Sequence, residues 1–420
     1  MGTRKERDRE NRSTRRAFLG AAGVLAAGVS LGAGRGGLSA GDETAASPAS
    51  DERTAKKDVE VRLAVVGGGF GSSHHWHEHP NCRVTAVSDL VESRRQRLVK
   101  AYGCEEVFPS LEVMLDKAAN TFDAVAIFTD APSHAQHALL CMDRGKHVVS
   151  ACPVALTLED CKKLKEKKEA SGLRYMMHES SYYRQPCIAA RELYQAGAFG
   201  RLAYSEVEYY HPTIGTRKSA LSRWQGQKSW RFGFPPMLYP THSLGLLVGV
   251  TRERIVKVSC MGQKVGEDFP AGKENRYDNP FDNEMALGTT DRGNVCRFGV
   301  FWQIAAHGER GQWLGEKMSC FMASSGGQPQ ARRKLHGGWE PWEVPDYWAT
   351  DRLPERMRHD SGHGGSAAFL SAEFIDALVE DREPSVDIYE SIAMTAPGIV
   401  AHHSALRGGE LLEVPRFDPT

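Results

Sequence analysis

EVRLAVV at residues 60–66 runs into GGGFG at residues 67–71, and CRVTAVSD follows at residues 82–89. The apolar runs on either side of the glycines predict two β-strands joined by a glycine turn and a helix. In such a unit the glycines let the backbone approach a pyrophosphate at the helix N-terminus, and an acid about 20 residues further on can bind the ribose diol. The stretch therefore predicts a dinucleotide site formed by Gly67, Gly69, Phe70, Gly71 and Asp89.

The glycine pattern is an imperfect match to GxGxxG. Counted from Gly67, it has Ser72 in the third glycine position, and counted back from Gly71, it has Val66 in the first. An ordinary glycine turn is the alternative interpretation, but the preceding strand and the spacing to Asp89 favour dinucleotide binding. Because the Asp89 carboxylate would accept from ribose hydroxyls and repel a 2′-phosphate, we expect NAD rather than NADP.

The alternation of strands and helices continues after Asp89. Strands are predicted at residues 122–129, 146–149 and 174–177, and helices at residues 134–143 and 158–170. Strands that alternate with helices in this way predict a doubly wound parallel sheet. We therefore expect an NAD-binding Rossmann domain over residues 61–180.

The pattern changes beyond residue 180. A helix at residues 185–196 is followed by predicted strands without intervening helices, at residues 202–210, 255–260, 285–290, 295–302 and 318–323. Such a run of strands predicts a large, mainly antiparallel open sheet, which helices at residues 367–380 and after residue 388 would cover. We expect residues 181–420 to form an α+β domain for substrate binding and oligomerisation, so that the fold class is α/β with two domains.

The N-terminal residues resemble a twin-arginine export signal. Thr14-Arg15-Arg16-Ala17-Phe18-Leu19 precedes a run of alanine, glycine and leucine that ends near Ala33. We expect a signal peptide at residues 1–40 and a linker at 41–60, which would place the mature protein in the periplasm or otherwise outside the cytoplasm. A disordered basic tail is the alternative. The run is short and rich in glycine, so we predict no membrane-spanning segment in the mature chain.

Composition bears on partners and metals. Lys plus Arg and Asp plus Glu both number 53, so a nucleic acid is not an expected partner. Nine cysteines without a CxxC pair predict neither a zinc site nor a disulfide framework. His75 and His79 would lie four residues apart on the predicted helix, at metal-ligand spacing. Because that helix begins at the dinucleotide turn, we expect no metal there.

Several segments together resemble the Gfo/Idh/MocA oxidoreductases: the glycine turn, Asp89, the run from Thr129 to His134, and GKHVVSACP at residues 145–153. The resemblance implies a two-domain enzyme that binds NAD or NADP in a Rossmann domain and a sugar against an open sheet, and that forms homo-oligomers. It places Thr129, His134, Cys152 and Ser180 beside the cofactor. Members of the family usually have Glu-Lys-Pro where this chain has Ala151-Cys152-Pro153, which weakens the interpretation as a plain sugar dehydrogenase.

LYPTHSLG at residues 238–245 is similar to a segment of the NAD-dependent glycoside hydrolases of family 109, typified by α-N-acetylgalactosaminidases. MMHE at 176–179, Tyr209, Trp230-Arg231 and GHGG at 362–365 agree with that branch. Ser180 stands where this branch has an asparagine, so the substrate specificity is open.

The resemblance implies a mechanism. NAD⁺ takes a hydride from C3 of the sugar, a base removes the acidified C2 proton, the C1 substituent leaves, water adds, and the hydride returns. By position Tyr209 is the candidate C2 base and His242 the proton acceptor or orienting group at the C3 hydroxyl, while Glu179 would support the cofactor or the proton relay. Arg231, Tyr239 and Thr241 would bind the sugar, with Tyr347 as a further candidate.

Alternatives accompany these assignments. Tyr209 or Tyr210 could be a core residue of a strand, His242 a helix cap, and Cys152 an inert buried thiol. The function predicted first is that of an exported NAD-dependent glycosidase. An NAD(P)-dependent sugar dehydrogenase or 3-keto-glycoside oxidoreductase, and a noncatalytic sugar- or nucleotide-binding protein, are the alternatives.

Overall fold

The computed structural model describes residues 59–212, 223–224, 227–264, 275–323, 328–334 and 336–419. The predicted export signal and nearly all of the predicted linker lie outside these residues. Among the helices that are described, none combines the length and the apolar character that crossing a membrane would require.

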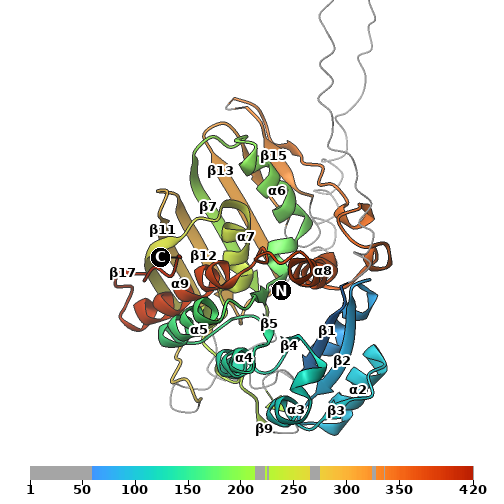
Figure 1. Cartoon of the computed structure of the whole chain (residues 1–420). Helices are drawn as coiled ribbons and strands as arrows, with labels where there is room; N and C mark the ends of the chain where they lie inside the picture. The colour runs from blue at the N-terminus through green and yellow to red at the C-terminus, as the bar shows by residue number, and fades with distance from the viewer. Residues whose placement is uncertain are drawn as a thin grey trace, which may run out of the picture. The chain divides into compact units, whose positions relative to one another are not determined.

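The first sheet is parallel throughout and has the strand order β3-β2-β1-β4-β5-β6. Its strands are β1 (Val61–Val66), β2 (Cys82–Ser88), β3 (Val107–Phe108), β4 (Ala124–Ile127), β5 (His147–Ala151) and β6 (Tyr175–His178). The helices between them are α2 (Glu92–Tyr102), α3 (Leu111–Ala118), α4 (His134–Asp143) and α5 (Leu158–Ser171). The doubly wound parallel sheet expected from the sequence is confirmed (Figure 1).

The helix predicted directly after the glycine turn is absent from the described structure, so that expectation was wrong. Two 3-10 turns, η1 (Gly71–Ser73) and η2 (Trp76–Glu78), occupy the connection between β1 and β2. The hydroxyl of Tyr102 in α2 donates to the carbonyls of Gly71 and His74, which a helix would need for its own bonds. The glycines before the turns are also poor helix formers.

The second sheet has nine strands in the order β16-β15-β14-β13-β7-β12-β11-β10-β17. Only the pair β7 and β12 is parallel among the strand pairs described in this sheet, and the mainly antiparallel sheet expected from the sequence is confirmed. The strands are β7 (Leu202–Tyr210), β10 (Ile255–Gln263), β11 (Asn283–Thr290), β12 (Val295–Phe301), β13 (Gly308–Gly315), β14 (Ser319–Phe321), β15 (Gln330–Arg332), β16 (Glu340–Pro341) and β17 (Leu412–Glu413). A separate two-stranded ribbon is formed by β8 (Arg223–Trp224) and β9 (Gln227–Lys228).

Four helices belong to this part of the chain: α6 (Gln185–Gln195), α7 (Thr241–Thr251), α8 (Ser366–Val379) and α9 (Ile388–Leu406). Of these, α7 and α9 pack against the second sheet, whereas α6 packs against α7, and α8 packs against the turn η5 (Ser180–Tyr183). Helix α7 is buried along its whole length, and the indole of Trp313 in β13 donates to the carbonyl of Leu246 at 3.0 Å. Side chains at Gly245 and Gly249 would press against Ser181 and Tyr182, so the two glycines allow α7 to pack closely there. This packing places the start of α7 beside the end of β6.

Helix α9 joins the two sheets. It lies against β10 of the second sheet and beside α5, which belongs to the first (Figure 1). Just before α9, the carbonyl of Val386 accepts from the backbone N–H of Met177 in β6 at 3.0 Å. The carboxyl ends of the parallel strands are thereby held next to the second sheet.

Candidate active site

A cavity of about 970 Å³ opens at the carboxyl ends of β1, β2, β4, β5 and β6. Ligands of open parallel sheets bind at this edge. The cavity also reaches residues of the second sheet and of α7, because the two are packed together. It brings together most of the site residues expected from the sequence, namely Gly67, Gly69, Phe70, Asp89, Thr129, His134, Cys152, Ser180, Tyr209, Arg231, Tyr239 and His242.

Steric crowding explains the glycines of the turn. Gly67 has φ +98°, and a Cβ on it would lie 2.2 Å from the carbonyl oxygen of Phe128. A Cβ on Gly68 would lie 2.2 Å from the carbonyl oxygen of Arg94. Gly71 packs against the Phe128 ring and is not among the residues that line the cavity. The turn can therefore keep its path beside β4 and α2 only if positions 67 and 68 have no side chain.

Asp89 directly follows β2, lines the cavity and is bound by backbone donors. Its carboxylate accepts from the N–H of Gly68 at 2.8 Å and from the N–H of Val91 at 2.7 Å. The carboxylate thus fixes the glycine turn relative to α2. Arg94 and Arg97 line the same end of the cavity. Sequence reasoning missed these arginines, although both follow the acid in the next helix.

His134 braces two loops of the cavity. Its Nδ1 lies 2.8 Å from the carbonyl oxygen of Pro153, and its Nε2 lies 3.2 Å from the carbonyl oxygen of Thr129. Burial lowers the pKa of His134, so the ring is neutral and has one N–H to donate. The shorter contact makes Pro153 the better acceptor. Through this one bond His134 holds the β5 loop, which carries Cys152, against the start of α4.

The centre of the site is a buried carboxylate–imidazole pair. Oε1 of Glu179 accepts from Nδ1 of His242 at 2.6 Å and from the N–H of Ser181 at 2.9 Å. Burial opposes both charges, but the attraction between them outweighs it. The pKa of Glu179 is held at about 2 despite its burial, and Glu179 raises the pKa of His242 well above its ordinary value. Glu179 does not line the cavity, so it acts through His242.

Aromatic side chains surround the other nitrogen of His242. Its ring lies 4.5 Å from the ring of Tyr209 and 5.3 Å from that of Tyr239, measured between centroids. The Cys152 thiol lies 3.9 Å from Nε2 of His242 and 3.6 Å from the hydroxyl of Tyr239. Burial raises the pKa of Tyr239 to about 12, and it raises that of Tyr209 further. Both hydroxyls are therefore protonated in the protein alone.

The proposed sugar-binding residues divide into two groups. Arg231 lines the cavity and stacks on Trp230, with its guanidinium carbon 4.0 Å from the ring centroid and 5.6 Å from that of Tyr239. Thr241 is fully buried at the start of α7 and does not line the cavity. Tyr347 also lies outside the cavity lining, where its hydroxyl donates to Glu192 at 2.9 Å.

Five histidines that line the cavity were missed as site residues, namely His74, His137, His178, His211 and His363. The rings of His74 and His178 are 4.4 Å apart. Burial lowers the pKa of His74, His178 and His363, that of His178 to about 3, so these three histidines present neutral rings. His178 belongs to the MMHE segment and His363 to the GHGG segment. The resemblance of these two segments to the family 109 enzymes could therefore have indicated both histidines.

Comparison with known families defines the class. Residues 61–179 match the Gfo/Idh/MocA family, described as an oxidoreductase family with an NAD-binding Rossmann fold. Residues 303–420 match the C-terminal domain of glycosyl hydrolase 109. The chain therefore combines an NAD-binding Rossmann domain of the Gfo/Idh/MocA type with a glycosyl hydrolase 109 C-terminal domain. The resemblances expected from the sequence are confirmed for these two segments, and NAD is the cofactor of the first.

Two of the relatives extend over almost the whole chain, and a third covers part of it. A glycosyl hydrolase family 109 protein of Parabacteroides distasonis is 24% identical and covers 96% of this chain and 97% of its own length. An α-N-acetylgalactosaminidase of Tannerella forsythia is also 24% identical, with the same coverage. A family 109 protein of Shewanella amazonensis is 32% identical over 55% of this chain and 53% of its own.

Solved structures share the fold. A levoglucosan dehydrogenase in complex with NADH and levoglucosan superposes with a TM-score of 0.69 at 16% identity, over 85% of this chain and 100% of its own. An NAD-binding oxidoreductase of Klebsiella pneumoniae has the same TM-score and coverage at 14% identity.

Proposed function

We propose that this protein is an exported NAD-dependent glycosidase related to the glycosyl hydrolase 109 enzymes. It would cleave a glycoside by transient oxidation at C3, elimination across C1 and C2, addition of water and re-reduction. The observation that carries the proposal is that one cavity contains both the glycine turn and the cluster of Tyr209, Tyr239 and His242. The relatives that match along nearly the whole chain support the choice of a glycosidase.

The residues of the turn fit a dinucleotide. Gly67 and Gly68 have no space for a side chain, and Asp89 lies at the cavity end of β2, where a ribose diol would be bound. When bound, NAD⁺ accepts a hydride from the sugar and returns it at the end of the cycle. The chain itself has to bind the sugar and move protons.

His242 is suited to accept the proton of the C3 hydroxyl. Glu179 engages Nδ1, so Nε2 is the nitrogen left for the cavity. The pKa of His242 is raised by Glu179, which makes Nε2 a strong proton acceptor once its own proton has left. Departure of that proton is favoured when a cation binds beside the imidazolium.

Tyr209 is the candidate base for the C2 proton, because it lines the cavity beside His242. Burial raises the pKa of its hydroxyl, while the positive charges of His242 and Arg231 act in the opposite direction. Tyr209 therefore becomes a base only when more positive charge gathers in the cavity. Arg231 and Tyr239, on the same wall, would orient the sugar.

Net sugar oxidation is the second candidate. It is favoured by the raised pKa of Tyr209, because proton removal at C2 is then the weakest step and oxidation could end at the ketone. A noncatalytic binding protein is the third possibility from the sequence, and no observation at the site favours it over the other two.

One experiment separates the candidates. Purified protein without residues 1–58 is incubated in D₂O with aryl α- and β-glycosides, and aglycone release, deuterium at C2 and NADH absorbance are followed. Aglycone release with C2 deuterium and constant NADH supports the glycosidase. Accumulating NADH with an intact glycosidic bond would make the protein a sugar dehydrogenase, and failure to react with any glycoside would leave a binding role.

We also propose that the protein is a homo-oligomer through its open sheet. Met261 in β10 and Leu287 in β11 are 65% and 49% exposed, which is unusual for large apolar side chains on neighbouring strands. Light scattering of the purified protein tests this, and a strictly monomeric mass would refute it.

A further inference from the structure

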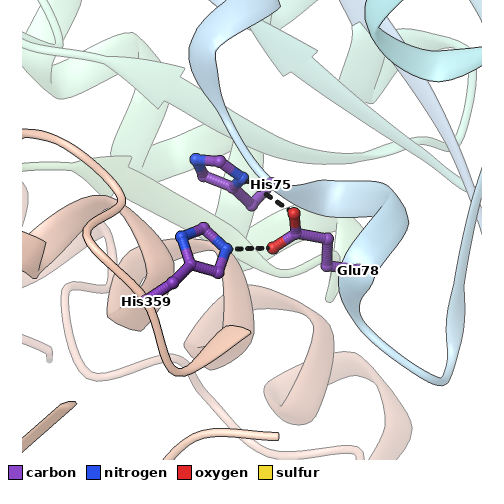
Figure 2. Close-up of side chains that lie close together, drawn as sticks. All are labelled: His75, Glu78 and His359. Carbon is purple, nitrogen blue, oxygen red and sulfur yellow. Dashed lines mark hydrogen bonds and ion pairs between the residues drawn. The ribbon is translucent and has the colours of Figure 1, made fainter. Parts of the chain in front are cut away.

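A second cluster of chemically active side chains lies outside the pair of Glu179 and His242. The Glu78 carboxylate lies between two imidazoles: Oε1 is 3.2 Å from Nδ1 of His75, and Oε2 is 2.6 Å from Nε2 of His359 (Figure 2). His75 and His359 also contact each other, with ring centroids 4.6 Å apart. One atom from each of the three residues lies within 4.8 Å of the other two.

These side chains come from distant parts of the chain. His75 and Glu78 belong to the connection between β1 and β2, at the turn η2, and His359 lies 281 residues beyond Glu78 (Figure 2). His359 follows the turn η9 (Glu355–Met357) and precedes the GHGG segment at 362–365. The contact between Glu78 and His359 therefore connects the segment between β1 and β2 to the segment that precedes GHGG.

We propose that His75, Glu78 and His359 bind one divalent cation of the zinc class. Two imidazoles and a carboxylate are ligands that zinc prefers, and a three-ligand set leaves a position for water. Zinc bonds of about 2.0–2.1 Å in tetrahedral geometry separate neighbouring ligand atoms by about 3.3 Å. The 3.2 Å between Nδ1 of His75 and Oε1 of Glu78 is close to that value. The 2.6 Å between Nε2 of His359 and Oε2 of Glu78 is shorter, so binding requires this imidazole and the carboxylate to move apart.

Burial is also suitable for a cation. The side chains of His75, Glu78 and His359 are 25%, 18% and 37% exposed. An ion can therefore reach the cluster from solvent, and a water ligand has space. The carboxylate supplies one negative charge to a site whose other two ligands coordinate as neutral bases.

The site has a structural consequence for the cavity. His363 lies four residues after His359, lines the cavity and contacts the ring of Phe70 at 5.4 Å. A cation held by His75, Glu78 and His359 would fasten the segment that carries His363 to the segment that carries Phe70. It would stabilise this wall of the cavity without touching the sugar-binding cluster.

Zinc binding to the purified protein, produced without a polyhistidine tag and freed of metal with a chelator, tests the proposal. Isothermal titration with Zn²⁺ should show one site per chain, and Zn²⁺ should raise the melting temperature. His359→Ala and Glu78→Gln should each weaken binding at least about tenfold, as expected when a ligand is lost. Both should also reduce the rise in melting temperature at the same Zn²⁺ concentration.

His77→Ala is the matched control, because His77 lies in the same turn, is exposed and is not one of the three ligands. It should bind zinc within about twofold of the parent. If the parent protein binds no zinc, or if Glu78→Gln and His359→Ala bind it as tightly as the parent, the proposal is overturned. The titration needs neither NAD nor a glycoside, so its result is independent of the proposed enzymatic activity.

Discussion

Glu179 and His242 are 63 residues apart in the chain, and Oε1 of Glu179 lies 2.6 Å from Nδ1 of His242. Glu179 follows β6 of the first sheet, and His242 belongs to the first turn of α7. The pair therefore depends on the packing of α7 against the end of the parallel sheet. It sets the proton affinity of an imidazole that lines the cavity.

Glu179→Gln should change the pH dependence of the enzyme. Glutamine keeps the shape but removes the charge that raises the pKa of His242. We expect kcat to fall by about 10²–10⁴-fold, the range for loss of assisted proton transfer. We also expect the acidic limb of the kcat/KM profile to move to lower pH, because a less basic His242 loses its proton earlier. Glu166→Gln is the control. Glu166 is an exposed residue of α5, so its replacement should leave the pH profile unaltered.

The same pair predicts a loss of stability in acid. The pKa of Glu179 in the folded protein is about 2, below its ordinary value of 4.5. A depressed carboxyl pKa contributes stability that is fully present above 4.5 and is lost as the pH falls towards 2. The difference in unfolding free energy between the parent and Glu179→Gln should therefore shrink over that interval. Urea titrations at several pH values measure it, and a difference that stays constant would contradict the assigned ionisation.

Tyr209→Phe should separate oxidation from elimination. The change removes only the hydroxyl, so the fold is expected to remain. Deuterium incorporation at C2 and aglycone release should fall at least about 100-fold, whereas the NADH formed in a single turnover should persist. Tyr210→Phe is the control, because the hydroxyl of Tyr210 donates to Glu208 and Tyr210 does not line the cavity. Equal losses in both variants would argue against Tyr209 as the C2 base.

Gly67→Ala should abolish cofactor binding. Its Cβ would meet the carbonyl oxygen of Phe128 at 2.2 Å, so the turn would have to move. Gly145 also has a positive φ, but a Cβ there would meet nothing within 4 Å. Gly145→Ala should therefore show only the cost of the backbone strain, about 1 kcal/mol, and should keep its NAD. Fluorescence titration with NADH and thermal melting distinguish the two.

Export should depend on Arg15 and Arg16. Residues 1–60 fused to a fluorescent protein that folds in the cytoplasm should carry it out of the cytoplasm of a bacterium with a twin-arginine translocase. Replacement of both arginines with lysine should retain the reporter in the cytoplasm. Cell fractionation measures this, and export that continues in the double variant would refute the prediction.

The strand-forming runs were sufficient to predict the parallel sheet, because it depends on local periodicity and spacing. The place of the dinucleotide at the glycine turn and Asp89 stays a prediction. Tyr209 and His242 were predicted from their segments, and the structure places both at the cavity. The role of either residue stays a prediction. Tyr347 had no motif to support it, and it lies outside the cavity lining.

Tertiary contacts determined the remaining features. The connection after Gly71 forms turns instead of a helix because the hydroxyl of Tyr102 in α2 engages the carbonyls of Gly71 and His74. The contact between His359 and Glu78 joins residues 281 positions apart, and periodicity carries no information at such a distance. Local patterns specify which elements form, since they reflect burial along one strand or helix. Which side chains meet across elements is decided only when those elements pack.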